Sequence, residues 1–201
     1  MRRSGAPARL DWRGRLEAAG VDAELAARVA AFLELLARFG GAVDLIGRVH
    51  AKELLRDHVL ESLAAVPLLP ERGRLLDLGS GGGFPAVPLL LARPALAGTL
   101  LEPRERRWAF LREVVRALAI DADVRRDPVT AVEGRFDAVT VRALGGGAWG
   151  SAVSRLLAPE GRLLWWTRET GAPGAGLERV VTSPLPNSER GAVVVWRRCS
   201  T

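Results

Sequence analysis

The amino-acid sequence predicts an α/β fold in which a basic arm and helical extension precede a mostly parallel sheet closed by an antiparallel strand pair. Residues 1–70 show helical spacing of apolar side chains and no strand pattern, whereas residues 71–201 alternate short apolar runs with longer amphipathic stretches. Strand–helix alternation is typical of parallel sheets, because each crossover helix returns the chain to the same edge. We therefore expect these two regions to pack as one compact body.

Two amphipathic helices are expected in the extension. Residues 23–39 place apolar side chains three and four positions apart, with Asp22 as the N-cap and a glycine pair at 40–41 as the stop. Residues 52–66 repeat this spacing. The arginine-rich residues 1–15 are expected to form a disordered, solvated tail.

The core is expected to alternate strands and helices. Strands are predicted over residues 74–78, 99–101, 122–125, 138–141 and 162–166, with a closing pair over 177–182 and 192–197. Helices are predicted over residues 86–92, 105–119, 130–133 and 148–157. Residues 168–176, rich in glycine, are predicted to be a loop.

Composition limits the possible classes of protein. The chain has 201 residues, of which 48% are hydrophobic, enough for one globular core. Its one cysteine, Cys199, allows no disulfide framework and no zinc site, so no metal is expected. The N-terminal residues lead into no apolar segment typical of a signal peptide, and no apolar run is long enough to cross a bilayer. We expect a cytoplasmic protein.

The net charge of +6 has two interpretations. An excess of positive charge attracts polyanions such as nucleic acids. However, Lys52 is the only lysine, and the chain is also rich in alanine, glycine and leucine, so the arginines can equally reflect a compositional bias. Charge alone leaves both interpretations open.

A glycine-rich turn directly after the first core strand is the strongest candidate for a binding site. Gly79, Gly81 and Gly83 follow the apolar residues 75–78, and ligands of α/β sheets bind at the C-terminal ends of the strands. The dinucleotide fingerprint requires a glycine at position 84, where this chain has Phe84, and a Walker-type loop requires Gly-Lys-Ser/Thr after the turn. These departures argue against a dinucleotide and against a nucleoside triphosphate.

Two carboxylates flank this turn in a pattern that favours S-adenosylmethionine. Glycines lack a Cβ, so the methionine part of that ligand can approach the backbone closely. Asp77, at the end of the first strand, can bind the ligand's ammonium group. Glu102, at the end of the next strand, can accept hydrogen bonds from both ribose hydroxyls. We therefore predict a site for this cofactor around Asp77, Gly79, Gly81, Gly83 and Glu102.

Three motifs of the core, DLGSGGGFPAVPL, LLEPRERRWAFL and FDAVTVRAL, resemble the RsmG (GidB) family of bacterial methyltransferases, which act on N7 of a guanine in 16S rRNA. The resemblance runs from about Phe32 to Trp166, and RDHVLESL, with Glu61 at the aspartate position, resembles the family's His-x-x-Asp-Ser segment. It implies a Rossmann-like S-adenosylmethionine-dependent methyltransferase fold. It also implies S-adenosyl-L-methionine as cofactor and 16S rRNA or the small ribosomal subunit as partner. We expect the enzyme to be a monomer and to have no association with a membrane.

The resemblance also assigns site residues. The family's cofactor contacts fall on Gly79, Phe84, Pro128, Val129 and Arg142, and we place Ser80, Pro103 and Asp127 in the same site. Its basic pair falls on Arg106 and Arg107, which with Arg104 form an expected RNA-binding cluster. Arg142 is expected to hold a substrate phosphate or to order the cofactor pocket. Guanine N7 presents a lone pair that needs no deprotonation, so no general base is expected.

Other positions depart from the family pattern or have a structural interpretation. Residues 39–50 lack the family's Trp-Asn-Lys…Asn-Leu-Thr segment, and Asp127 stands where the family has arginine. Two alternatives therefore stay open: a methyltransferase of the same ancestry acting on another RNA or a small molecule, and a non-catalytic module that binds S-adenosylmethionine or RNA. His58 is expected to be a hydrogen-bonded packing residue rather than a catalyst. Trp165 and Trp166 are expected to belong mostly to the core, with stacking of one of them on a base as the alternative.

Overall fold

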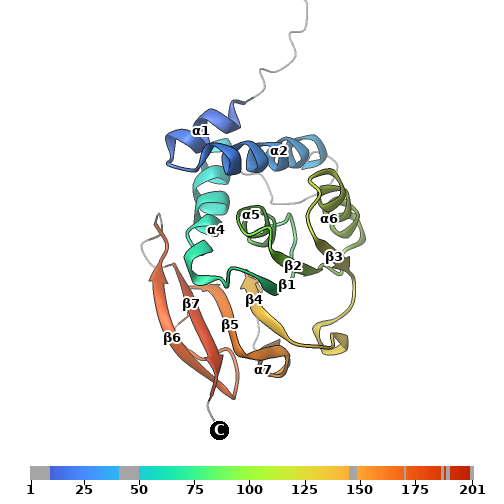
Figure 1. Ribbon diagram of the computed structural model, residues 1–201, viewed down its shortest axis with the longest axis vertical. Helices are drawn as coiled ribbons and strands as arrows, with labels where there is room; N and C mark the ends of the chain where they lie inside the picture. The colour runs from blue at the N-terminus through green and yellow to red at the C-terminus, as the bar shows by residue number, and fades with distance from the viewer. Residues whose placement is uncertain are drawn as a thin grey trace, which may run out of the picture.

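The computed structural model describes residues 10–40, 50–144, 149–169, 171–186, 188 and 191–199. A seven-stranded sheet in the order β3-β2-β1-β4-β5-β7-β6 forms its centre (Figure 1). The strands are β1 Gly73–Leu78, β2 Leu96–Leu101, β3 Ala122–Arg125, β4 Phe136–Arg142, β5 Leu157–Thr167, β6 Leu177–Pro184 and β7 Ala192–Arg198. Strands β1 to β5 pair in parallel, whereas β7 is antiparallel to both of its neighbours. The predicted sheet and its closing strand pair are confirmed.

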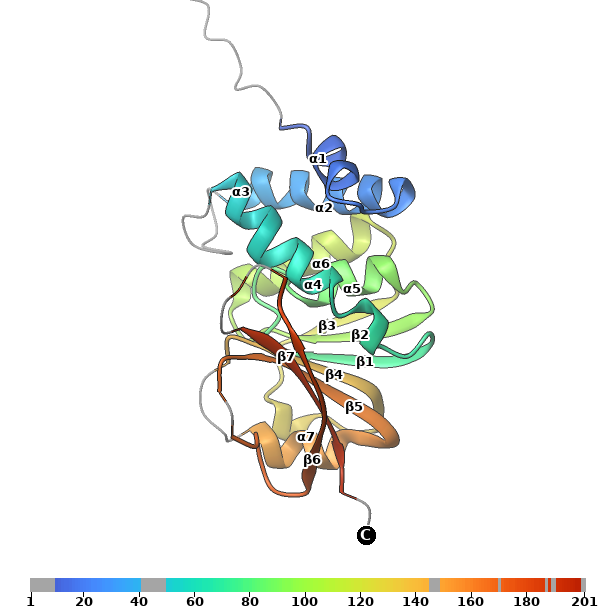
Figure 2. The same ribbon diagram turned by 90° about the vertical axis from the view of Figure 1, so that its left-hand side faces the viewer.

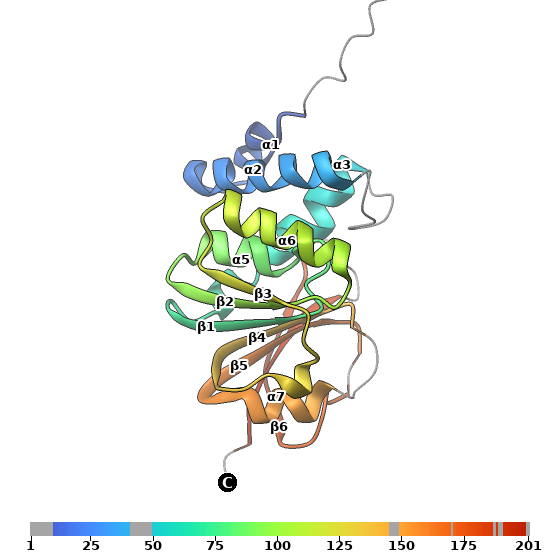
Figure 3. The ribbon, with the colours of Figure 1, turned by 90° about the vertical axis from the view of Figure 1, so that its right-hand side faces the viewer.

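Helices cover both faces of the sheet, as Figure 3 shows. The first face carries α5 Ala86–Ala92 and α6 Glu105–Ala117, and the second carries the 3-10 turn η3 Val129–Ala131 and α7 Gly150–Leu156. Successive strand residues point to opposite faces. Leu75 accordingly belongs to the apolar core of the first face and its neighbour Leu76 to that of the second. The sheet is therefore buried on both sides, which explains the near-continuous apolar runs of its parallel strands.

The same alternation decides the role of the two tryptophans at the end of β5. Trp166 packs into the core of the first face and Trp165 into that of the second, where its ring makes an edge contact with Trp149. The two side chains are 5% and 6% exposed. The expectation that both tryptophans belong to the core is therefore confirmed.

The N-terminal helices share the core of the first face. They are α1 Trp12–Ala18, α2 Ala23–Gly40, α3 Ala51–Glu53, the π-helical segment η1 Leu54–Leu60, α4 Glu61–Leu63 and the 3-10 turn η2 Val66–Leu68. Helix α2 lies on the outer side of α5 and α6 (Figure 2). One apolar cluster contains buried residues of α1 and α2 together with those of α5, α6 and the sheet. The expected packing of the extension onto the core is thus present, while a domain boundary at residue 70 stays a prediction.

The structure corrects several expected elements. Helix α1 occupies part of the region expected to be a tail, because Asp11 caps it by accepting a hydrogen bond from the Gly14 amide, and Trp12 and Leu16 are buried against the neighbouring helices. Residues 1–9 lie outside the described part of the chain. The helix expected from residue 52 is π-helical at its centre, and the one expected at 130–133 is a single 3-10 turn.

Other expected bounds were close to those observed. Helix α2 begins after Asp22, whose carboxylate accepts hydrogen bonds from the amides of Glu24 and Leu25, as predicted. Strand β2 begins three residues earlier than expected, at Leu96, because it pairs with β1 along its whole length. None of the helices in the described ranges is long and apolar enough to cross a lipid bilayer.

Candidate functional site

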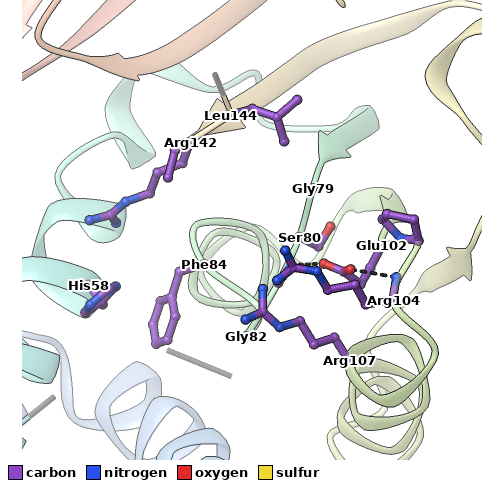
Figure 4. Close-up of a pocket in the computed structure, with 13 residues that line it drawn as sticks. His58, Gly79, Ser80, Gly82, Phe84, Glu102, Arg104, Arg107, Arg142 and Leu144 are labelled. Carbon is purple, nitrogen blue, oxygen red and sulfur yellow. Dashed lines mark hydrogen bonds between the residues drawn. The ribbon is translucent and has the colours of Figure 1, made fainter. Parts of the chain in front are cut away.

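A cavity of about 380 Å³ opens where β1, β2 and β4 end at the same edge of the sheet. We call it the glycine-turn cavity. Figure 4 shows the glycine turn, Glu102 and Arg104 on one side of it, and His58, Phe84 and Arg142 on the other. Its lining residues are His58, Gly79, Ser80, Gly81, Gly82, Phe84, Glu102, Pro103, Arg104, Arg107, Arg142, Ala143 and Leu144. The structure thus places at one sheet edge most of the residues predicted for the cofactor.

The glycine turn is held against the end of β2. The amides of Gly79 and Ser80 both donate to the carbonyl oxygen of Leu101, at 2.9 Å. Gly79 has a φ of +72°, and a Cβ at this position would lie 2.2 Å from Leu144 Cδ1. The backbone conformation therefore favours glycine here, and any larger residue would also require the Leu144 side chain to move.

Gly83 is the glycine of the turn that packs against the helices. It does not line the cavity. Its φ is +96°, and a Cβ there would meet Val87 Cγ2 at 2.9 Å and the Phe32 ring at 3.1 Å. Gly83 therefore lets helix α2 pack closely against the start of α5. Its predicted place in the cofactor site stays a prediction.

The carboxylate of Glu102 fixes the geometry of the turn. Its Oε2 accepts a hydrogen bond from the Gly81 amide at 2.8 Å, and its Oε1 accepts one from the Arg104 amide at 2.9 Å. The side chain is buried. Each carboxylate oxygen has a second lone pair, so Glu102 can still accept a hydroxyl of a bound ligand.

Asp77 lies beneath the cavity rather than in its wall. Its Oδ1 accepts a hydrogen bond from Thr140 Oγ1 at 2.6 Å, whereas its buried Oδ2 has no partner among the described residues. Burial raises the pKa of Asp77 to about 6, although hydrogen bonds to the carboxylate act in the opposite direction. A buried carboxylate oxygen without a partner fits a cationic group supplied by a ligand.

The opposite wall combines an aromatic contact with a neutral histidine. The His58 and Phe84 ring centroids are 5.3 Å apart. Burial, and then the positive charge of Arg142, lower the pKa of His58 to about 4. His58 is therefore uncharged at neutral pH. It packs against Phe84 as expected, but it also lines the cavity, a position that we did not assign to it.

Arg142 joins the cavity to the N-terminal extension. Its Nη2 donates to Glu61 Oε2 at 2.7 Å and to the main-chain carbonyl of Asp57, within the π-helical segment η1. The Trp166 indole N–H donates to the Glu61 carbonyl at 3.2 Å. Burial lowers the pKa of Arg142 and raises that of Glu61, while the attraction between the two charges opposes both changes. Arg142 Nη1 is buried and has no partner among the described residues.

Comparison with known proteins identifies the family. The model of the GidB family, described as rRNA small subunit methyltransferase G, matches residues 26–167, the part of the chain that builds the cavity. This chain belongs to the GidB family. The predicted family resemblance is confirmed.

Sequence relatives carry the same family name. The chain is 38% identical over 132 residues to a "Ribosomal RNA small subunit methyltransferase G" of Stenotrophomonas maltophilia, covering 64% of this chain and 62% of the relative. It is 39% identical over 143 residues to the protein of that name from Mycobacterium leprae, covering 71% of this chain and 55% of the relative. The chain therefore spans less than two thirds of the length of these relatives.

A solved structure supports the fold. The ribosomal protein L11 methylase of Lactobacillus delbrueckii subsp. bulgaricus superposes with a TM-score of 0.59 at 13% identity, over 70% of this chain and 77% of that one. At this level of identity the likeness shows the fold alone. The Rossmann-like methyltransferase fold predicted from the sequence is confirmed.

Several residues assigned from the GidB resemblance lie outside the cavity wall. Asp127, Pro128 and Val129 do not line it. The Asp127 carboxylate instead pairs with Arg125 Nε at 2.7 Å, and Val129 packs against the core of the second sheet face. The structure does not test whether they approach a bound ligand, so their role as cofactor contacts stays a prediction.

The three arginines of the expected RNA-binding cluster all lie at the start of α6, and their role in RNA binding stays a prediction. Arg104 and Arg107 line the cavity, whereas Arg106 is exposed outside it.

Residues 41–49, within the segment that departs from the GidB pattern, lie outside the described ranges. Across those ranges, no group of three His, Cys, Asp or Glu side chains is placed to hold a metal ion.

Proposed function

We propose that this GidB family member is an enzyme that transfers a methyl group from S-adenosylmethionine to N7 of a guanine in 16S rRNA. The observation that carries the proposal is the family match over residues 26–167, which includes the whole glycine turn and both flanking carboxylates. The two relatives described above are named as methyltransferases of small-subunit rRNA. We further propose that the protein acts as a monomer on rRNA or the small ribosomal subunit in the cytoplasm.

The residues of the cavity fit S-adenosylmethionine. Asp77 Oδ2 is buried and unpartnered within the described structure, so it can accept a hydrogen bond from an ammonium group. Gly79 leaves room for a ligand to approach the main chain. Glu102, held at the end of β2, is positioned to accept ribose hydroxyls. These three residues are our assignment for the cofactor.

The remaining chemistry requires positioning rather than proton transfer. When bound, S-adenosylmethionine supplies an electrophilic methyl group on a sulfonium ion. Guanine N7 carries no proton, so the chain needs no general base, and His58 with a pKa of about 4 is a poor one at neutral pH. A neutral His58 also avoids repelling the cationic groups expected in this cavity. The enzyme contributes by aligning the acceptor and excluding water.

The first test is transfer of labelled methyl from S-adenosylmethionine to small-subunit rRNA from cells that lack this protein. The RNA is offered both free and as assembled subunits, and the modified base is mapped. We expect label at N7 of one guanine. The matched control is Asp77→Asn, which should lose transfer because it loses cofactor affinity.

Three other outcomes would change the proposal. Label at a different RNA position, or on a small molecule, would retain methyl transfer and replace the substrate. Cofactor binding without transfer to any RNA offered would favour the non-catalytic module. Absence of cofactor binding by the wild-type protein would overturn the assignment of the cavity.

A further inference from the structure

A second cavity lies directly beside the glycine-turn cavity. It has a volume of about 300 Å³ and shares Arg142 and Ala143 with the first. We call it the Arg168 cavity. It is lined by Glu61, Arg142, Ala143, Trp166, Thr167, Arg168, Leu185, Ser188 and Gly191. Because Arg142 lines both cavities, a ligand that enters one of them lies next to a ligand in the other.

Two hydroxyl groups of the Arg168 cavity are oriented by the main chain. Thr167 Oγ1 accepts a hydrogen bond from the Glu169 amide at 2.9 Å. Ser188 Oγ accepts one from the Gly191 amide at 2.8 Å. Each amide occupies a lone pair of the hydroxyl oxygen, so each hydroxyl hydrogen stays available to donate elsewhere. The cavity thus has two preset hydroxyl donors.

The charged groups of this cavity favour an anionic ligand. Among the described residues that line it, the charged ones are Arg142, Arg168 and Glu61. The Glu61 carboxylate is bound to Arg142 Nη2, so it is neutralised within the wall. Arg142 Nη1 and the exposed Arg168 guanidinium remain as cationic donors, and no described residue accepts from Nη1. Cationic and hydroxyl donors together are typical of phosphate recognition.

We propose that the Arg168 cavity binds one backbone phosphodiester of the RNA beside the nucleotide to be methylated. This inference rests on the proposed function, because it takes the glycine-turn cavity as the place of methyl transfer. A phosphodiester carries a negative charge and two free oxygens, which can accept hydrogen bonds from these cationic and hydroxyl donors. Arg142 would then connect the two ligands, since it forms part of both cavities.

The test measures RNA affinity as a function of salt concentration for the wild-type protein, Arg168→Ala and Arg198→Ala. Arg198 is a matched control: it is an exposed arginine at the far end of β7, whose other end, Ala192, pairs with Thr167 at the cavity. We expect Arg168→Ala to bind small-subunit rRNA about tenfold more weakly. The slope of log affinity against log salt should fall by about one. Arg198→Ala should leave both quantities unchanged.

A second pair of measurements separates this site from the cofactor site. The dissociation constant for S-adenosylmethionine should be the same for Arg168→Ala and the wild type, while the KM for rRNA rises and kcat is retained. Thr167→Val removes a hydroxyl at constant side-chain shape and should also raise the KM for rRNA. Inorganic phosphate should compete with RNA only weakly, because it makes none of the contacts that the rest of the RNA chain makes with the protein.

The outcomes distinguish this proposal from the proposed function. In one outcome, the slope of log affinity against log salt falls by one in Arg168→Ala, but the wild type transfers no methyl group. This outcome would support the phosphate site and overturn the methyltransferase activity. Methyl transfer by the wild type, with equal slopes for wild type, Arg168→Ala and Arg198→Ala, would overturn the phosphate site alone. Strong competition by inorganic phosphate would replace the phosphodiester by a free phosphate.

Discussion

Replacing Asp77 by asparagine should strengthen the fold and weaken cofactor binding at the same time. Burial raises the pKa of Asp77 from 3.8 to about 6, a difference of about two pH units. At 1.36 kcal/mol per unit, ionising this carboxylate in the folded protein costs about 3 kcal/mol relative to the unfolded chain. The folded state holds the proton more tightly, so its stability decreases as the pH rises from about 4 to about 6. The side chain of Asp77→Asn does not ionise, so this variant does not lose stability in that way as the pH rises. Its amide oxygen can still accept a hydrogen bond from Thr140 Oγ1.

The same substitution removes the carboxylate that we assign to the cofactor's ammonium group. A hydrogen bond to a charged group contributes about 1.5–3 kcal/mol, so the dissociation constant of Asp77→Asn should be about 10- to 150-fold higher at pH 7.5. In the wild type, affinity should fall about tenfold per pH unit below about 6, where Asp77 becomes protonated. Titration calorimetry with S-adenosylmethionine measures both effects.

The stability effect is measured by urea unfolding of both proteins between pH 4 and pH 8. Asp77→Asn should be more stable by up to about 3 kcal/mol at pH 7.5 and by almost nothing at pH 4. His58 contributes a dependence of opposite sign, since its lowered pKa makes the folded protein lose stability as the pH falls from about 6.5 to about 4. Both proteins contain His58, so the difference between them isolates Asp77. A difference that is independent of pH, or a cofactor affinity that the substitution leaves unchanged, would refute this reasoning.

Two further predictions concern the cavity and its support. Gly79→Ala should weaken cofactor binding, because the φ of +72° is strained for alanine and the Leu144 side chain would have to move away from the new Cβ, which would lie 2.2 Å from its Cδ1. The control Gly20→Ala, also at positive φ but with nothing within 4 Å, should lose about 1 kcal/mol of stability and bind normally. Glu61→Gln should lower the free energy of unfolding by about 3–5 kcal/mol in urea titrations, since it leaves the buried charge of Arg142 without its partner; a loss below 1 kcal/mol would show that this ion pair is not important for the fold.

The sequence was sufficient to predict the elements that depend on residues close to one another along the chain. The period of apolar residues was sufficient to place α5 at residues 86–92 and β3 at residues 122–125, with the bounds observed in the structure. The glycine turn was predictable because closely spaced glycines after a buried strand have few other uses, and Asp77 and Glu102 because each ends a strand at the same sheet edge. These features depend on neighbours along the chain.

Elements that depend on distant contacts were predicted less well. Helix α1 is short and polar, with a glycine in its first turn, and it is stabilised by burying Trp12 and Leu16 beside α2. The early start of β2 follows from pairing with β1, and the π-helical segment η1 has no sequence pattern that we recognised. Propensity alone cannot show such features, because tertiary packing supplies most of their stability.

The composition of the site was likewise decided partly by the tertiary structure. The resemblance to the GidB family named Arg142, but only the fold shows that its guanidinium is bound to Glu61, 81 positions earlier in the chain. The same packing places His58 in the cavity wall and Gly83 outside it. The helices that cover the sheet decide which charged side chains come together at the site, and therefore which pKa values change. The sequence thus determined the family, the fold class and the cofactor motif, and the tertiary structure decided which charges are buried together and which donors remain for a ligand.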